Sequence, residues 1–260
     1  MANQSQALTP PMQLLSTLLL LLATCTAVVV AGGRPPPPAP PPPKPIPLRW
    51  GVLAFPKYVG LDAYGPIEML NIVKFLTPNM TIAVIAETMD PVPAHVVNDL
   101  GGPATLMQPT HTIYDNVTLD VLLIPGGPGS RIAYNNTNII NYVKNVYPKL
   151  QYIVSVCTGA QVLAKAGILD GKRATTNKFS WAEMVRSGPN VKWQPCARWV
   201  TDGNIWTSSG VAAGIDLTHA FIKKIFRNET LADRAANILE IEIHKDPSWD
   251  PFCKVWNATI

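Results

Sequence analysis

Short apolar runs alternate with stretches of helical periodicity from about residue 48 onward. The runs are short enough for strands buried on both faces, and they are Trp50–Phe55, Thr81–Ala86, Leu119–Ile124 and Tyr152–Cys157. Apolar residues spaced three or four apart predict helices that open at Gly65-Pro66 and that cover 132–146, 158–167, 181–185, 212–226 and 231–243. A two-stranded pattern surrounds Asp202-Gly203. The alternation predicts an α/β fold, with a parallel central sheet and helices on both faces.

Cys157 stands at the point where a predicted strand turns into a helix. A thiol at such a turn, a nucleophile elbow, points toward the helix N-terminus, where the helix dipole and free N–H groups favour the reactive thiolate. Ser155 occupies a position where the usual elbow has glycine. We expect Cys157 to be a catalytic nucleophile. The alternative is an inert cysteine that closes a core strand.

Two further loops are expected at the same edge of the sheet, because the carboxyl ends of parallel strands lie together. Asp62 follows the first strand, and Pro125-Gly126-Gly127 follows the third. We expect Asp62 to hydrogen-bond the Cys157 thiol or to transfer substrate protons. Backbone N–H groups at Gly126, Gly127 and Thr158 are expected to form an oxyanion hole that binds substrate. Taken alone, each loop also fits an ordinary turn.

The N-terminal region has a different composition from the rest of the chain. Residues 1–31 contain no Lys, Arg, Asp or Glu, and residues 14–31 are almost wholly apolar. This predicts a signal peptide over 1–31 and a secreted, extracellular protein without stable membrane contact. The alternative is a membrane anchor formed by residues 14–31. A proline-rich linker over 32–47, expected as an extended spacer, leads to a folded domain over 48–260.

Cysteines and glycosylation sequons agree with export. Cys25 is lost with the signal peptide, and if Cys157 stays free, Cys196 and Cys253 remain as a candidate disulfide. Two unpaired thiols are the alternative. Five Asn-x-Thr sequons in the mature region predict glycosylation, at Asn79, Asn116, Asn135, Asn228 and Asn257.

Charge and histidine spacing exclude two classes of partner. The net charge of +4 is small, and no run of Lys and Arg mixed with aromatic residues predicts nucleic-acid binding. His95, His111, His219 and His244 lack the spacing of metal ligands, so no metal is expected. His219, inside an apolar helix, is expected in the core, and His244 is expected at the surface.

Several motifs occur together in an order that resembles the ThiJ/PfpI superfamily, a class I glutamine amidotransferase-like group, over about residues 49–226. They are Asp62-Ala-Tyr-Gly-Pro66, Ile124-Pro-Gly-Gly127, Ser155-Val-Cys-Thr-Gly-Ala160, Gly171-Lys-Arg-Ala-Thr-Thr176 and Ser209-Gly-Val-Ala-Ala-Gly-Ile-Asp216. The resemblance implies a flavodoxin-like sandwich, commonly a dimer, with a reactive cysteine at the elbow and no metal or organic cofactor.

Departures from the family pattern separate its branches. Peptidase-like members have His after the cysteine, where this chain has Thr158, and true glutamine amidotransferases have a late His-x-Glu that is missing here. Glyoxalases and deglycases generally use Glu where this chain has Asp62. The Leu-Asp-x-x-Gly-Pro loop with Cys-Thr-Gly most resembles isonitrile hydratase, although Asn177 replaces a frequent His after Thr-Thr. The stretch from His244 to Phe252 resembles a tail of fungal members.

The resemblance implies a cysteine-dependent enzyme that hydrates a small electrophilic substrate of the isonitrile type, and the N-terminal stretch and sequons predict that it is secreted. The Cys157 thiolate would attack the substrate carbon, and Asp62 would supply and recover protons. A glyoxalase-like hydration of reactive dicarbonyls is the second interpretation. The third is a non-catalytic redox or binding protein, in which Cys157 is oxidised instead of catalysing.

Overall fold

The computed structural model describes residues 44–95 and 105–259. The predicted signal peptide 1–31 and most of the predicted linker lie outside these residues. The compact unit begins at Lys44, four residues before the expected start of the domain. Pro47 is buried, and its carbonyl accepts a hydrogen bond from Trp50 Nε1 at 3.3 Å. Within the described ranges, no helix has the length and apolar character needed to cross a membrane.

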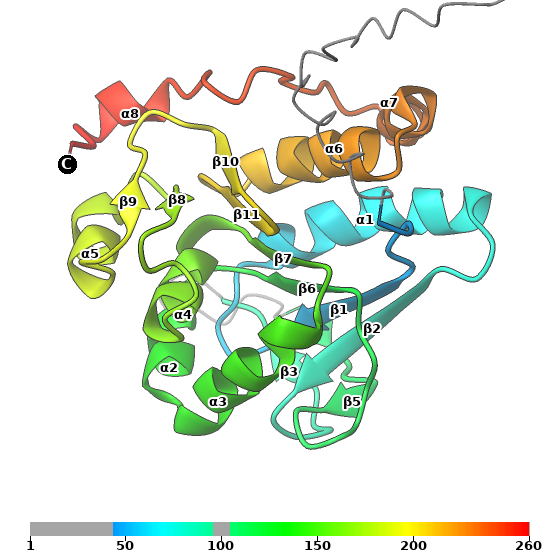
Figure 1. Ribbon diagram of the computed structural model, residues 1–260, viewed down its shortest axis with the longest axis horizontal. Coiled ribbons are helices and arrows are strands. Elements are labelled where there is room, and N and C mark those ends of the chain that lie inside the picture. The colour runs from blue at the N-terminus through cyan, green and yellow to red at the C-terminus, as the bar shows by residue number, and fades with distance from the viewer. Residues whose placement is uncertain (1–43, 96–104, 260) are drawn as a thin grey trace, which may run out of the picture. The chain divides into compact units, whose positions relative to one another are not determined.

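A seven-stranded sheet forms the centre of the fold (Figure 1). Neighbouring strands run parallel, except for the antiparallel pair at one edge that forms the hairpin expected around Gly203. In spatial order the strands are β10 (Trp199–Asp202), β11 (Ile205–Ser208), β7 (Tyr152–Ser155), β6 (Val121–Ile124), β1 (Arg49–Leu53), β2 (Thr81–Ala86) and β5 (His111–Thr112). Two small pairs are separate from this sheet, β3 (Val92–Pro93) with β4 (Leu106–Met107), and β8 (Arg173–Ala174) with β9 (Lys192–Trp193).

Helices cover both faces of the sheet, as the alternation of strands and helices predicts (Figure 1). One face carries α1 (Gly60–Leu76), α6 (Ala213–Ile225) and α7 (Glu229–Ile238). The other carries α2 (Ser130–Asn135), α3 (Thr137–Val146), the 3₁₀ turn η2 (Tyr147–Lys149), α4 (Ala160–Lys165) and α5 (Trp181–Ser187). A short helix near the C-terminus, α8 (Phe252–Val255), was not expected from the sequence.

Aromatic side chains join α6 to the sheet. The Phe221 ring meets the rings of Trp50, Tyr152 and Trp206 edge-on, at centroid distances of 5.0, 5.2 and 5.1 Å. Each such pair adds about 0.5–1.5 kcal/mol beyond the burial of its area. The three partners lie on β1, β7 and β11. Phe221 therefore ties α6 to three strands of the sheet, including β7, which leads to the elbow.

Helix α1 begins at Gly60, five residues before the expected start at Gly65-Pro66. Pro66 therefore lies inside the helix, where it has no N–H to donate to the carbonyl of Asp62. The buried face of the helix, with Met69, Leu70 and Val73, packs on the core and offsets this loss. As a consequence, Asp62 lies in the first turn of α1 rather than in a loop.

Two other helices differ from the expected ranges. The helix expected over 132–146 is divided at Asn136, whose Oδ1 accepts hydrogen bonds from the backbone N–H groups of Asn138 and Ile139 and caps α3. The last predicted helix, over 231–243, ends at Ile238. Glu240 has φ +52°, and the Ile241 N–H donates to the Ala236 carbonyl at 3.0 Å, a helix-ending motif that usually uses glycine.

Candidate active site

Cys157 occupies a strained turn between β7 and α4. It begins the 3₁₀ turn η3 (Cys157–Gly159) with φ +58°, a left-handed conformation that costs a residue other than glycine about 1–3 kcal/mol. Its N–H donates to the Ser209 carbonyl at 2.9 Å, and its carbonyl accepts from Thr176 Oγ1 at 2.9 Å. The residue is only 5% exposed. The elbow expected from the sequence is therefore present, and neighbouring loops hold its backbone on both sides.

The structure brings Asp62 next to Cys157. Asp62 is fully buried, and its Oδ2 accepts a hydrogen bond from the Gly126 N–H at 2.9 Å. A Cβ atom on Gly126 would lie 2.8 Å from Asp62 Oδ2 and 2.8 Å from Cys157 Cβ, so both residues pack directly against this glycine. In the described part of the chain, the buried Asp62 Oδ1 has no hydrogen-bond partner of good geometry, yet Asp62 and the thiol are close enough to shift each other's pKa.

Burial controls the protonation of both groups. It raises the pKa of Asp62 to about 7, although hydrogen bonding to the Gly126 N–H and the Cys157 thiol acts in the opposite direction. Burial, followed by the negative charge of Asp62, raises the pKa of Cys157 well above its usual value, and the Thr158 N–H lowers it only in part. The sequence-based expectation of a resting thiolate is therefore corrected. The N–H groups at the helix N-terminus stabilise the thiolate less than burial destabilises it. The resting pair is therefore a thiol beside a carboxyl group.

The expected oxyanion-hole residues lie at the elbow, but their N–H groups have protein partners. The Gly126 N–H donates to Asp62, and the Gly127 N–H donates to Thr158 Oγ1 at 2.8 Å. Thr158 Oγ1 in turn donates to the Gly127 carbonyl at 3.1 Å. The glycine N–H groups reach a substrate only if these bonds open. A role in binding developing charge thus stays a prediction for Gly126, Gly127 and Thr158.

A buried ion pair, missed by the sequence analysis, lies beside the elbow. Lys178 Nζ is 3.3 Å from Asp250 Oδ2, and both side chains are almost completely buried. Burial lowers the pKa of Lys178 to about 8, although the charge of Asp250 acts in the opposite direction. In the sequence, Lys178 looks like any surface lysine, and no spacing links it to Asp250. The one indirect cue is that Asp250 lies close to a cysteine of the candidate disulfide.

The remaining predicted site residues are placed as follows. Cys196 and Cys253 form a disulfide, and Cys157 is free. His219 is buried with its Nε2 2.8 Å from Asp233 Oδ1, and the His244 ring stacks on Trp249 at 4.0 Å. All five sequon asparagines are exposed, and their glycosylation stays a prediction. Among residues 44–95 and 105–259, no three His, Cys, Asp or Glu side chains are grouped to hold a metal ion.

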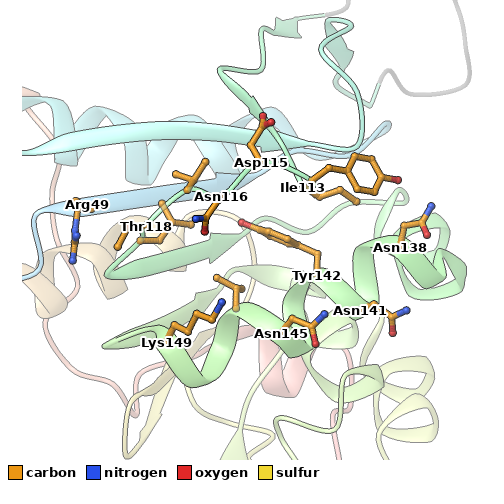
Figure 2. Close-up of a pocket in the computed structure, with 14 residues that line it drawn as sticks. Arg49, Ile113, Asp115, Asn116, Thr118, Asn138, Asn141, Tyr142, Asn145 and Lys149 are labelled. Atoms are coloured by element: carbon orange, nitrogen blue, oxygen red, sulfur yellow. The ribbon is translucent and has the colours of Figure 1, made fainter.

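Two cavities differ in their relation to the elbow. One, of about 250 Å³, adjoins it and is lined by polar Asn177, Lys178 and Ser209, and by aromatic Phe179, Phe252 and Trp256. A larger cavity of about 390 Å³, the α3 cavity, lies between α3 and residues 113–119, with Arg49 and Lys149 among its lining residues (Figure 2). The ring of Tyr142 extends from α3 toward the opposite segment (Figure 2). Neither Cys157 nor Asp62 lines either cavity, but Ser209, which bonds the Cys157 backbone, lines the smaller one.

Comparison with known proteins shows the family of this chain. The sequence model of the DJ-1/PfpI family matches residues 52–224. The chain belongs to this family. A ThiJ/PfpI family protein from Pseudomonas syringae superposes with a TM-score of 0.65 and 25% identity, covering 82% of this chain and 84% of that one. Drosophila melanogaster DJ-1beta superposes with a TM-score of 0.62 at 18% identity, covering 74% and 97%. The flavodoxin-like fold is thereby confirmed.

The sequence relatives include proteins whose names describe enzymes of two kinds. Isonitrile hydratase from Pseudomonas putida is 28% identical over 202 residues, which are 77% of this chain and 80% of that protein. A deglycase from Pyrococcus horikoshii is 31% identical over 96 residues, which are 37% of this chain and 55% of that protein. The DJ-1/PfpI match ends at residue 224, before the C-terminal segment that carries Asp250 and Cys253.

Proposed function

We propose that this DJ-1/PfpI protein is a cysteine-dependent hydratase of small electrophilic substrates of the isonitrile type. The observation that carries the proposal is the pair formed by Cys157, at φ +58°, and the fully buried Asp62 carboxyl group, with one oxygen lacking a partner in the described residues. A carboxyl group with a pKa near 7 beside a protonated thiol is suited to accept and return one proton at neutral pH. The likeness to isonitrile hydratase, over most of both chains, supports the same conclusion.

In the proposed reaction, the thiol proton moves to the Asp62 carboxylate as Cys157 Sγ forms a bond to the isonitrile carbon. Asp62 then delivers this proton to that carbon, which gives a thioimidate. Water adds across the carbon–nitrogen bond, the C–S bond breaks, and the proton returns to sulfur. The net change is addition of one water to the isonitrile, giving an N-substituted formamide. Asp62 ends each cycle in its initial state, so no co-reactant other than water is consumed.

The cavity of about 250 Å³ beside the elbow supports a substrate with an apolar or aromatic substituent. Its wall contains the rings of Phe179, Phe252 and Trp256, and the Phe179 and Trp256 rings meet edge-on at 4.9 Å. Gly210 and Ser209 line the same cavity, and the Ser209 carbonyl bonds the Cys157 N–H. The substituent would lie among these rings, beside the Ser209 backbone that bonds Cys157.

The direct test measures formamide production from an aryl isonitrile, with methylglyoxal as a second substrate. Cys157→Ala should abolish formamide production, and Asp62→Asn should slow it by about 10²–10³-fold, because the proton acceptor is lost. In the wild type, the rate should rise with pH through about 7, where Asp62 ionises. Formamide production by Cys157→Ala would refute the mechanism. Turnover of methylglyoxal alone would favour the dicarbonyl hydration, and stoichiometric oxidation of Cys157 without turnover would favour a redox protein.

We also propose that the protein is exported and glycosylated. The support is the apolar N-terminal stretch, the Cys196–Cys253 disulfide and the exposure of all five sequon asparagines. Expression of the full chain in a eukaryotic secretory host should release protein that begins after residue 27 or 31 and loses mass on treatment with an N-glycosidase. Retention in the membrane fraction with an intact N-terminus would instead support an anchor formed by residues 14–31.

A further inference from the structure

The backbone of Cys157 belongs to a closed ring of polar contacts, the elbow ring, formed by Cys157, Ser209, Asp250, Lys178 and Thr176. From the Cys157 N–H, the contacts lead to the Ser209 carbonyl (2.9 Å) and from Ser209 Oγ to Asp250 Oδ2 (2.6 Å). The same Asp250 oxygen is 3.3 Å from Lys178 Nζ, which donates to the Thr176 carbonyl at 3.0 Å. Thr176 Oγ1 closes the ring on the Cys157 carbonyl at 2.9 Å.

Every member of the elbow ring is buried. Thr176 is fully buried, Ser209 and Lys178 are each 2% exposed, and Asp250 is 8% exposed. Polar groups removed from water in this way keep their partners, since losing one leaves an unsatisfied donor or charge. The ring therefore fixes both peptide groups that determine φ and ψ of Cys157, a residue whose left-handed conformation persists only if its surroundings enforce it.

Asp250 is the one ring member that lies beyond the family match, in residues 244–259, the C-terminal segment. This segment is attached to the domain along its length. Arg198 donates its N–H to the Pro247 carbonyl at 2.8 Å, and its guanidinium lies 5.1 Å from the centroid of the Trp249 ring. Three residues after Asp250, Cys253 is bonded to Cys196. Trp181 Nε1 donates to the Thr259 carbonyl at 2.6 Å. These contacts hold Asp250 between Ser209 and Lys178.

We propose that Asp250 of the C-terminal segment is a positioning residue for Cys157, which acts through Ser209 and through Lys178 and Thr176 to hold the sulfur against Asp62. The proposal rests on the proposed function for its catalytic meaning, but the positioning itself is independent of the substrate. The charged groups that interact with the sulfur are Asp62 from α1 and Lys178 from the loop before α5, and Asp250 from the C-terminal segment pairs with Lys178. Loss of the ring lets Cys157 relax from φ +58° and moves the thiol away from its proton acceptor.

The test follows alkylation of Cys157 by iodoacetamide between pH 5 and 10, together with kcat and KM for an aryl isonitrile. Ser209→Ala removes the hydroxyl that bonds Asp250 and retains the carbonyl that bonds Cys157. The double variant Asp250→Asn with Lys178→Met opens the ring without leaving an unpaired buried charge. Asp246→Asn, an exposed carboxylate of the same segment, is the matched control. Circular dichroism restricts the comparison to folded protein, and Asp62→Asn supplies the reference profile for a thiol without its base.

In wild type and Asp246→Asn, the alkylation rate should show an inflection near pH 7, where Asp62 ionises. In both ring variants the inflection should weaken toward the Asp62→Asn profile, and kcat should fall about tenfold or more with little change in KM. If the double variant does not fold, Ser209→Ala decides the matter alone. A lower melting temperature with an unchanged alkylation profile and kcat would overturn the proposal. If no variant, wild type included, hydrates the isonitrile but the alkylation profiles differ as expected, the proposed function fails and the positioning role stands.

Discussion

The elbow and the α3 cavity differ in the burial and charge of their residues, which cavity volume does not show. The α3 cavity, at about 390 Å³, is larger than the 250 Å³ cavity beside the elbow. Asn138, Asn141 and Lys149 line it, and their side chains extend from α3 and the turn that follows (Figure 2). The elbow instead contains Asp62 and Cys157, which are buried, with perturbed pKa values and a strained backbone. Chemistry is expected where polar groups have been removed from water, rather than in the larger of these two cavities.

Two aspartates near these regions differ in their pKa values. Asp120 lies just before the N-terminal end of β6, next to the α3 cavity, and Asp62 bonds Gly126, just beyond the C-terminal end of β6. Burial raises the pKa of Asp120, but hydrogen bonds from the Arg49 side chain and from the backbone of Arg49 and Leu48 outweigh it, so the pKa lies below its usual value. At Asp62, burial prevails over a single backbone donor. One carboxylate is thus held ionised by its hydrogen bonds, and the other has a pKa near neutral, as the proposed proton transfer requires.

The largest expected effect separates these two aspartates by stability. A carboxyl group with a pKa of about 7 when folded and 3.8 when unfolded reduces the free energy of unfolding by roughly 4 kcal/mol above pH 7, and this cost disappears as the pH falls toward 4. Asp62→Asn should therefore raise the melting temperature at pH 8 much more than at pH 4.5, while it slows turnover.

Asp120→Asn is the matched substitution with the opposite sign. Because the pKa of Asp120 is lowered in the folded protein, its contribution to stability is present above its unfolded pKa and is lost in acid. Asp120→Asn should lower the melting temperature at pH 7 by a larger amount than at pH 3. Melting curves at three pH values measure both variants. If the change in melting temperature followed the same pH trend in both variants, the assigned difference between Asp62 and Asp120 would be wrong.

A smaller effect is expected from adding one methyl group at the elbow. In Gly126→Ala, the new Cβ would lie 2.5 Å from Thr158 N and 2.8 Å from Asp62 Oδ2, contacts that force the loop to shift. Overpacking of this kind costs about 1–3 kcal/mol, and it should slow turnover further by separating Asp62 from Cys157. Gly60→Ala is the control, since its Cβ would meet nothing within 4 Å at the start of α1. Comparable loss of kcat in both variants would contradict the role assigned to Gly126.

The smallest effect is expected in the α3 cavity. Tyr142→Phe removes a hydroxyl whose pKa burial raises to about 12, and leaves the ring that lines the cavity. Isonitrile turnover should stay within about twofold, and the free energy of unfolding within about 0.5 kcal/mol. Steady-state kinetics and a denaturant titration check both values. A tenfold loss of kcat would mean that the α3 cavity takes part in the reaction.

Sequence patterns predicted the sheet, the elbow and the meeting of Asp62 with Cys157, because each depends on local apolar runs and on a general property of parallel strands. The predicted start of α1 was wrong because proline favours the first turn of a helix, so an interior position for Pro66 was not expected. The predicted end of α7 was wrong because Glu240 adopts a helix-ending conformation that is usually found at glycine.

The protonation of Cys157 and the elbow ring were beyond the reach of sequence patterns. The pKa of Cys157 depends on how far Asp62 and the surrounding core remove the sulfur from water, which no local motif encodes. The ring joins Cys157, Thr176, Lys178, Ser209 and Asp250, which are brought together only by the folded chain. Its most distant member, Asp250, lies beyond residues 52–224, which the family model matches.

The buried, protonated state of Cys157 also bears on how long the nucleophile survives. Thiol–disulfide exchange and oxidation by peroxide both proceed through the thiolate. A cysteine that is 5% exposed and whose thiol has a raised pKa is therefore a poor partner for the Cys196–Cys253 disulfide and for diffusing oxidants. One protein can then keep both a disulfide and a free cysteine under oxidising conditions. In the proposed reaction, the thiol stays protonated until a substrate enters and Asp62 takes its proton.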